Sequence, residues 1–314
     1  MRAVLPLLAF ATLGCALCAQ GCDRGHHETP TSAPVVAPSA AKTCSLAPIA
    51  LKLAMPKRAV AIGDLHGDLD AARAALRTAG AIDAGDTWIG KDLTIIQTGD
   101  VLDRGEDESK VLELLERLDT DAHAQGGAVI QLIGNHELMN AAHDFRYVTE
   151  GGARDFDGDR QHELAPGGTW AKRIAQHNVI AIVPTAGGDT VLSHAGITAE
   201  WVSHVDEVNE HARCWLDGQE GGADHPTAAL TSDDSPVWTR AWGGPQVDCT
   251  ALTAVLDKLG AKRMVVAHTP QPAGISSQCD GALWRIDVGL AKHYGGPIEV
   301  LELGDPPKVI KGQR

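Results

Sequence analysis

Three stretches of the chain share one pattern. Residues 58–67 are RAVAIGDLHG, residues 93–105 are LTIIQTGDVLDRG and residues 128–137 are AVIQLIGNHE. In each, a short aliphatic run ends near a glycine and is followed at once by Asp, His or Asn. Aliphatic and β-branched residues pack well on the pleated surface of a sheet, so the runs predict buried strands over 58–62, 93–97 and 128–133. The glycines permit tight turns that let the polar side chains after each strand converge.

Amphipathic stretches between these runs predict helices over 68–79 and 108–118, and the alternation of strand and helix is typical of an α/β fold. Open α/β sheets bind ligands at the C-terminal ends of their strands, where all three polar motifs lie. Further along, the sequence predicts a polar excursion over 141–167, a helix over 169–177 and a loop over 213–235. The remaining strands are expected over 179–183, 190–193, 263–267, 274–277, 282–288 and 298–303. No internal repeat is found, so residues 44–314 are expected to form a single domain.

The charge balance excludes one class of function. The 314 residues include 27 Lys and Arg against 41 Asp and Glu, a formal charge of -14, and no run of five or more basic residues occurs. Nucleic-acid backbones are held chiefly by Lys and Arg, so no nucleic-acid partner is expected. A protein of this charge that handles phosphate needs another source of positive charge, and divalent metal ions are the obvious candidate. A monomer is expected.

The first residues predict an export signal. A basic start, an apolar stretch over 3–19 and small residues before Cys22 form the layout of a signal peptide over 1–21. The signal peptide is of the bacterial lipoprotein type, in which the cysteine after the cleavage site, here Cys22, is lipidated. The apolar stretch is shorter than the ~20 residues that cross a bilayer, so membrane contact is expected only through a lipid anchor at Cys22. Residues 22–43 are rich in Pro, Ser and Ala and predict a disordered tether. We therefore expect an exported protein, either periplasmic or a membrane-anchored lipoprotein of a bacterium.

Four cysteines follow the signal region: Cys44, Cys214, Cys249 and Cys279. In an oxidising compartment they can form two disulfides with three possible connectivities. We favour a bridge between Cys214 and Cys249, because both flank the same expected loop, and four free structural thiols are the alternative.

Five motifs carry candidate metal ligands: the three quoted above, Ser-His-Ala-Gly at 193–196 and Ala-His-Thr-Pro at 267–270. One such motif alone is a weak signal, whereas five in order, each after an aliphatic run, indicate a common site. Hard divalent cations bind carboxylate and imidazole groups, and two cations about 3.5 to 4 Å apart share a bridging oxygen ligand. The ligand types suit Mn, Fe or Zn, with Mn favoured for activity. We expect the first cation on Asp64 and His66, a bridge from Asp100, and the second cation on Asn135, His194 and His268.

This ligand set predicts hydrolysis of a phosphoester. A water shared by two cations loses its proton near neutral pH, because a metal ion can lower the pKa of water from 15.7 to about 7, and the bridging hydroxide would attack phosphorus. His136, next to a ligand but not one itself, is the expected general acid, with Asp103 fixing its tautomer. Arg104 is expected to bind the phosphoryl oxygens through its planar fork. Arg240, which closes the segment SPVWTR, is a second candidate, with a plain surface position as the alternative.

These motifs resemble those of the calcineurin-like metallophosphoesterases, and Asp-Arg-Gly at 103–105 is similar to the phosphoprotein phosphatases within them. The resemblance spans residues 58 to about 290. It implies a layered α/β (α+β) fold in which two mixed β-sheets pack as a sandwich flanked by helices, with a dimetal site at the strand C-terminal ends. It also implies the metal ligands given above, His136 with Asp103 as the acid pair, and Arg104 as a phosphate ligand.

Finer features resemble the Shewanella-like branch of that family. They are Asn140, the run FRYV at 145–148, the segment SPVWTR at 235–240 and IDVG at 286–289. In that branch Arg240 is the second phosphate arginine. Arg146 and Tyr147 become substrate-side candidates, with packing as the alternative.

The function expected is that of a metal-dependent phosphomonoesterase, a protein phosphatase acting on phosphotyrosine, phosphoserine or phosphothreonine. Two alternatives stay open. One is a dinucleoside polyphosphate or nucleotide hydrolase, although symmetrical dinucleoside tetraphosphatases typically carry Asn-Arg where this chain has Asp103-Arg104. The other is a metal- or phosphate-binding lipoprotein without turnover, for which His136 and Asp103 would be superfluous. The expected partner is accordingly a phosphorylated protein or a small phosphoester.

Overall fold

The computed structural model describes residues 44–314, and the predicted signal peptide and tether lie outside these residues. The first of two mixed sheets has the strand order β10-β9-β1-β2-β3. In it β1, β2 and β3 run parallel, whereas β9 is antiparallel to β1 and β10 to β9. The bounds are β1 Arg58–Ile62, β2 Leu93–Gln97, β3 Ala128–Gln131, β9 Glu299–Glu302 and β10 Lys308–Lys311.

The second sheet has the order β4-β5-β6-β8-β7, and its central strands β5, β6 and β8 are again parallel. The edge strands β4 and β7 are antiparallel to their neighbours. The bounds are β4 Ile180–Val183, β5 Thr190–Ser193, β6 Arg263–Val266, β7 Ser276–Gln278 and β8 Leu283–Arg285.

The side-chain alternation of β1 shows how the two sheets pack. Ala59 and Ala61 lie in a cluster with Leu192 and Val265 of the second sheet, while Val60 and Ile62 belong to the larger core under the helices. Successive residues of a strand point to opposite faces, so an aliphatic run without polar interruption is buried on both sides. This confirms the predicted sandwich of two mixed sheets flanked by helices.

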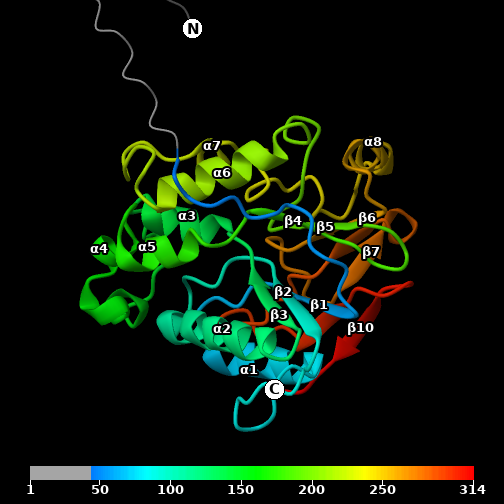
Figure 1. The fold of residues 1–314 in the computed structure, drawn as a ribbon, viewed down its shortest axis with the longest axis horizontal. Helices are drawn as coiled ribbons and strands as arrows, with labels where there is room; N and C mark the ends of the chain where they lie inside the picture. Colours follow the sequence, from blue (N-terminus) through cyan, green and yellow to red (C-terminus); the bar gives the residue numbers. More distant parts are fainter. Residues whose placement is uncertain (1–43) are drawn as a thin grey trace, which may run out of the picture. The chain divides into compact units, whose positions relative to one another are not determined.

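Helices cover the outer faces. Figure 1 shows α1 and α2 beneath the first sheet, and a group from α3 to α7 on the opposite side of the molecule. Among residues 44–314, no helix has the length and apolar character needed to span a bilayer. The bounds are α1 Leu69–Ala79, α2 Glu108–His123, α3 Asn135–Ala141, α4 Arg160–Leu164, α5 Thr169–Ile174, α6 Val205–Leu216, α7 Ala228–Thr231 and α8 Cys249–Leu259.

The ends of α1 illustrate how the sequence sets the helix bounds. The Asp68 side chain accepts a hydrogen bond from the Ala71 amide at 2.9 Å, which caps the first turn. Gly80 ends the helix with φ 74°, a left-handed conformation that glycine adopts without strain. The predicted helix over 68–79 is therefore confirmed, with Asp68 as its cap.

The loop expected over 213–235 is partly wrong. Helix α6 continues to Leu216 and α7 forms a further turn within that range. Val208, Ala212 and Trp215 are buried at helical spacing, but Arg213 is buried among them and interrupts the apolar pattern. Its guanidinium donates to the carbonyls of Ala175 and Ala47 at 2.9 and 3.0 Å.

The predicted bridge between Cys214 and Cys249 is also wrong. The disulfides are Cys44–Cys214 and Cys249–Cys279. Cys214 lies on the buried face of α6, against which the chain just after Cys44 packs. Cys249 is the first residue of α8, and the turn that contains Cys279 lies beside it. Position on either side of one expected loop was therefore a poor guide to which thiols meet, and part of that loop is helical.

Candidate active site

The six parallel strands of the two sheets all lead into one pocket. The predicted metal ligands follow β1, β2, β3, β5 and β6 directly, and none of them is more than 7% exposed. The sixth parallel strand, β8, leads to Asp287, which is 1% exposed. The structure thus brings together residues scattered from position 64 to position 287, namely Asp64, His66, Asp100, Asn135, His194, His268 and Asp287.

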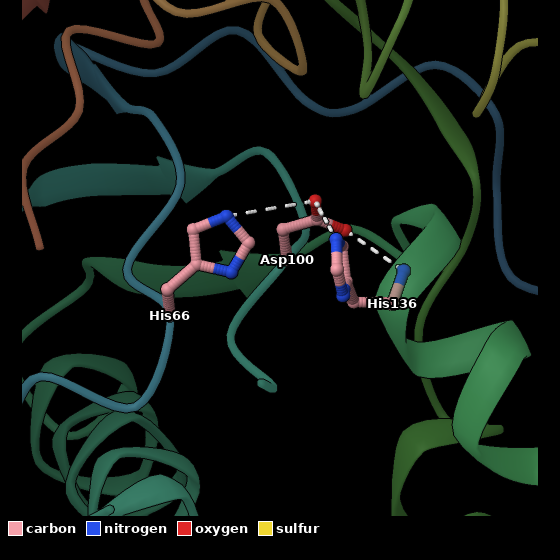
Figure 2. A group of neighbouring side chains, drawn as sticks. All are labelled: His66, Asp100 and His136. Atoms are coloured by element: carbon pink, nitrogen blue, oxygen red, sulfur yellow. Dashed lines mark hydrogen bonds and ion pairs between the residues drawn. The ribbon is translucent and has the colours of Figure 1, made fainter. Parts of the chain in front are cut away.

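The carboxylate of Asp100 is the centre of this cluster. Figure 2 shows the imidazoles of His66 and His136 on either side of it. The Oδ2 atom of Asp100 lies 3.9 Å from Nε2 of His66 and 3.7 Å from Nε2 of His136. Nε2 of His194 lies 3.1 Å from the same oxygen. Asp100 therefore belongs to both groups whose ligand atoms converge closely enough to hold a metal ion, His66–Asp100–His136 and Asp100–His194–His268.

The other predicted ligands adjoin these groups. Nε2 of His194 lies 3.0 Å from Oδ1 of Asn135 and 3.2 Å from Nδ1 of His268. Oδ2 of Asp64 lies 3.8 Å from Nε2 of His66. The sequence predicts Asp64, His66 and Asp100 as ligands of the first cation, whereas the first of the two groups contains His136 in place of Asp64. Asp64 lies beside this group, next to His66.

Burial and neighbouring charge decide the protonation of the cluster. Burial by itself would raise the pKa of the Asp100 carboxyl, but the imidazoles of His194 and His136 outweigh it and lower that pKa well below its usual range. Burial lowers the pKa of His66 to about 3 and that of His268 to about 2, so both rings are neutral at pH 7. Neutral imidazole is the form that coordinates metal ions.

The backbone around Asp100 is held by a second buried carboxylate. Glu137 accepts hydrogen bonds from the amides of Asp100, Val101 and Gly134 at 2.9, 2.8 and 2.7 Å. A Cβ on Gly99 would lie 2.5 Å from the amide nitrogen of Gly134, so the turns after β2 and β3 touch only because glycine is present. Glu137 thereby fixes the loop after β2 against the start of α3.

Several residues of the site have left-handed backbone conformations. Asp100, Asp103 and Arg104 have φ values of 57°, 68° and 66°, and His66 and His268 have 44° and 66°. Such conformations are costly for residues with a Cβ and cluster at functional sites, where the surrounding structure enforces them. They turn the side chains after the strands toward one another.

His136 is oriented by a buried polar network. Its Nδ1 lies 2.5 Å from Oδ2 of Asp103, whose other oxygen accepts hydrogen bonds from Asn140 Nδ2 and Arg160 Nη2 at 3.0 Å each. Nη2 of Arg160 also lies 2.6 Å from Oε2 of Glu108. Burial raises the pKa of Glu108 to about 7, although Arg160 opposes the shift. Nε2 of His136 is left facing Asp100.

The two predicted phosphate arginines line the same small pocket, of about 70 Å³, as Asp100, Asn135, His136 and His268. The guanidinium of Arg104 lies 4.9 and 5.3 Å from the ring centres of Tyr147 and Tyr294, which also line the pocket. Nη1 of Arg240 donates to the hydroxyl of Thr269 at 3.1 Å. Arg240 is exposed, yet its place in the pocket favours the substrate-binding interpretation over a plain surface position.

Sequence reasoning missed three features of this site. Glu137 lies within the Gly-Asn-His-Glu motif that supplies Asn135 and His136. Asp287 lies inside the strand expected over 282–288, whereas β8 ends at Arg285, so the expected strand was too long to mark Asp287 as a residue after a strand. Arg160 carries no local signal, because its partners Asp103 and Glu108 are more than fifty positions away.

The comparisons with known proteins agree with this geometry. The family model of calcineurin-like phosphoesterases matches residues 57–272. Shewanella-like protein phosphatase 2 of Arabidopsis thaliana is 36% identical over 299 residues, which cover 79% of this chain and 75% of that protein. Shewanella-like protein phosphatase 1 of Plasmodium berghei is 29% identical over 254 residues, covering 76% and 69%.

Among solved structures, the cold-active protein-tyrosine phosphatase of a psychrophilic Shewanella species superposes with a TM-score of 0.70. Its sequence identity is 22%, and the match covers 84% of this chain and 83% of that one, so it supports the shared fold. This chain belongs to the calcineurin-like phosphoesterase family and, within it, to the Shewanella-like protein phosphatases. The predicted phosphoester hydrolase is thereby confirmed, and the family implies divalent metal ions at the site.

We predict that Arg160→Met strongly destabilises the fold. Without the guanidinium, Glu108 loses its one ion-pair partner among the described residues and Asp103 keeps only His136. Removing one partner of a buried ion pair costs about 3 to 5 kcal/mol. The measurement is the free energy of unfolding in urea. Arg154→Met is the matched control, because Arg154 pairs with exposed Glu150 at 2.9 Å and its loss is expected to change stability by less than about 1 kcal/mol. Equal losses in the two variants would contradict the assigned role of Arg160.

Proposed function

We propose that this protein is a metal-dependent phosphomonoesterase that removes phosphate from phosphorylated protein side chains. The observation that carries the proposal is the shared position of Asp100. Its carboxylate belongs to both candidate metal groups, and the pocket that it lines also contains Arg104 and Arg240. A pair of adjacent cations with two arginines beside them suits a phosphoryl group, which carries negative charge on several oxygens.

The donor set fits two divalent cations. Nδ1 of His268 lies 3.2 Å from Nε2 of His194 inside the buried group that also contains Asp100, and facing ring nitrogens of this kind are suited to a shared metal ion. We assign Asp64, His66 and Asp100 to one cation and Asp100, Asn135, His194 and His268 to the other. The donors are oxygen and nitrogen atoms without thiolate, which supports Mn as the metal for activity. When bound, the cations supply neutralisation of phosphoryl charge and activation of water as the nucleophile.

The chain's own residues supply binding and proton transfer. Arg104 and Arg240 approach the pocket from different segments and would hold the phosphoryl oxygens between them. Asp103 accepts a hydrogen bond from Nδ1 of His136, which leaves Nε2 to carry a proton toward the pocket. His136 at Nε2 would donate that proton to the oxygen of the leaving group, and such general acid catalysis contributes about 10² to 10⁴ in rate.

Aromatic side chains at the pocket support phosphotyrosine as a substrate. Tyr147 and Tyr294, the only two tyrosines of the chain, both line it and are 39% and 37% exposed. A phosphotyrosine ring can stack between such side chains, whereas phosphoserine offers no ring. Burial raises the pKa of Tyr294 above its usual value, so its phenol stays neutral beside an anionic phosphate. One protein of similar fold, from a psychrophilic Shewanella species, is a protein-tyrosine phosphatase, which supports the same preference.

We predict that His136→Ala and Asp100→Ala fail in different ways. His136→Ala keeps its metal content and loses about 10² to 10⁴ in kcat on phenyl phosphate, but less on p-nitrophenyl phosphate, whose leaving group needs no proton. Asp100→Ala loses metal as well as activity, because the ligand common to both groups is gone. Elemental analysis and steady-state kinetics with added Mn²⁺ measure both effects. Metal loss in His136→Ala would instead make His136 a ligand.

The same native enzyme is assayed on phosphotyrosine and phosphoserine peptides and on a dinucleoside tetraphosphate. Hydrolysis of the peptides is expected. Preference for the dinucleoside tetraphosphate would favour the alternative hydrolase. Absence of turnover on every compound would favour a binding lipoprotein.

We predict that replacing both Tyr147 and Tyr294 by leucine changes substrate preference. Each aromatic contact is worth about 0.5 to 1.5 kcal/mol, so the ratio of kcat/KM for phosphotyrosine over phosphoserine peptides falls by roughly tenfold. The two substitutions also remove packing on Arg104, but this lowers kcat/KM equally for both peptides and therefore leaves the ratio unchanged. An unchanged ratio would mean that the two rings serve only to support Arg104.

We further propose that the protein is exported, anchored through a lipid on Cys22 and active as a monomer without a nucleic-acid partner. The two disulfides support an oxidising compartment, since disulfides are rare in the reducing cytosol. The mass of the N-terminal peptide from protein extracted out of membranes tests the anchor. A mature N-terminus at Cys22 bearing acyl chains is expected, and an unmodified N-terminus elsewhere would exclude lipidation.

A further inference from the structure

A second cavity, of about 690 Å³, lies apart from the residues of the active site. We call it the α6–α7 cleft, because α6, α7 and the segment between them form its walls; Figure 1 shows both helices above the group of α3 and α5. The half-buried indole of Trp201 contributes apolar surface to the cleft, and Trp215, which is 1% exposed, borders it from the core side. The indole nitrogen of Trp215 donates to the carbonyl of Gly222 at 3.0 Å, so this wall is built by specific contacts.

The cleft carries negative charge. Its lining includes four carboxylates, those of Glu200, Glu207, Glu220 and Asp234, and no Lys or Arg. Glu207 and Glu220 lie 2.7 and 2.8 Å from the imidazoles of His204 and His211. Asp234 accepts a hydrogen bond from the Trp201 indole at 3.2 Å. Among the described residues, no group of converging metal donors occurs here. A partly exposed indole, that of Trp201, among carboxylates suits an organic cation, which is attracted by both.

One segment of the chain lines both this cleft and the active site. Ser232 and Asp234 line the α6–α7 cleft, and Trp238 and Arg240 line the catalytic pocket. Arg240 lies six positions after Asp234, so their Cα atoms are at most about 22 Å apart even for a fully extended chain. An extended peptide of about seven residues spans that distance. A phosphorylated side chain in the pocket and a basic side chain in the cleft can therefore belong to one substrate.

We propose that the α6–α7 cleft binds Lys or Arg side chains that flank the phosphorylated residue of the protein substrate. This rests on the proposed protein phosphatase activity for its substrate, but the binding itself does not depend on turnover. Charge complementarity selects the occupant, because a cationic side chain meets four carboxylates and the indole of Trp201 there, and no Lys or Arg lines the cleft. The cleft then determines which residues are preferred beside the phosphorylated residue of the substrate, while the catalytic pocket removes the phosphate.

The test compares two phosphotyrosine peptides that differ only in carrying Arg or Gln within about seven residues of the phosphotyrosine. At low ionic strength the native enzyme is expected to show a roughly three- to tenfold lower KM for the Arg peptide, and the difference shrinks as salt is added. In the double variant Glu200→Gln, Glu207→Gln the two KM values become equal. The rate on p-nitrophenyl phosphate, which is too small to reach the cleft, stays unchanged.

A matched control removes two carboxylates elsewhere. Glu113 of α2 and Asp257 of α8 are exposed and form no ion pair with any residue of 44–314. Glu113→Gln, Asp257→Asn also removes two negative charges, so it alters net charge by the same amount. This control is expected to keep the preference for the Arg peptide. Equal KM values in the native enzyme, or a preference that survives in the cleft variant, would overturn the proposal.

Binding is measured separately from activity. The unphosphorylated Arg peptide is expected to change tryptophan fluorescence of the native protein and not of the cleft variant. If it binds in this way but no phosphopeptide is hydrolysed, the proposed function fails and the cleft assignment stands. If the Gln peptide binds equally well, the cleft is an apolar site and the proposed charge recognition is wrong.

Discussion

The rest of the site depends on one buried negative charge, the carboxylate of Asp100. A carboxylate that is 1% exposed is costly unless it is paired, and three imidazoles surround it, those of His66, His136 and His194. His194 and His136 are the two that favour its charge most, whereas His66 is neutral at pH 7. These rings come from β1, α3 and β5, so the two sheets must pack with the ends of their parallel strands at one place. The same carboxylate joins both candidate metal groups. The geometry of the sandwich and the chemistry of the site are therefore set by one constraint.

Holding that charge in place requires a strained backbone. Asp100 and four other residues of the pocket have positive φ values, each of which costs about 1 to 3 kcal/mol. Hydrogen bonds from backbone amides to Glu137 and the close contact of Gly99 with Gly134 offset this cost locally. The aliphatic strands on either side, buried on both faces, supply the remaining stability. Rigidity of this kind keeps the ligands aimed at a common point, as metal and acid-base chemistry require.

The sequence predicts the features whose causes are local. The strands over 58–62 and 93–97 and the helix that starts near residue 68 follow from short runs of residues. The family resemblance implies that the polar residues after the strands form one site. The pairing of Cys44 with Cys214 does not follow, since it depends on where α6 lies in space. The contact of Arg160 with Asp103 likewise joins segments 57 positions apart, through a polar excursion without periodicity. Long-range pairing of polar groups is decided by tertiary packing, which no local pattern records.

An acidic protein that binds an anionic substrate must separate its charges. The formal charge of -14 repels a phosphate at long range, but at physiological ionic strength the Debye length is about 8 Å, so distant carboxylates act weakly inside the pocket. There Arg104, Arg240 and the cations that the family implies dominate. Outside it the carboxylates of the α6–α7 cleft face solvent and attract the opposite sign of charge. A substrate with a phosphate on one residue and positive charge on its neighbours satisfies both regions, whereas a small free phosphoester satisfies only the first.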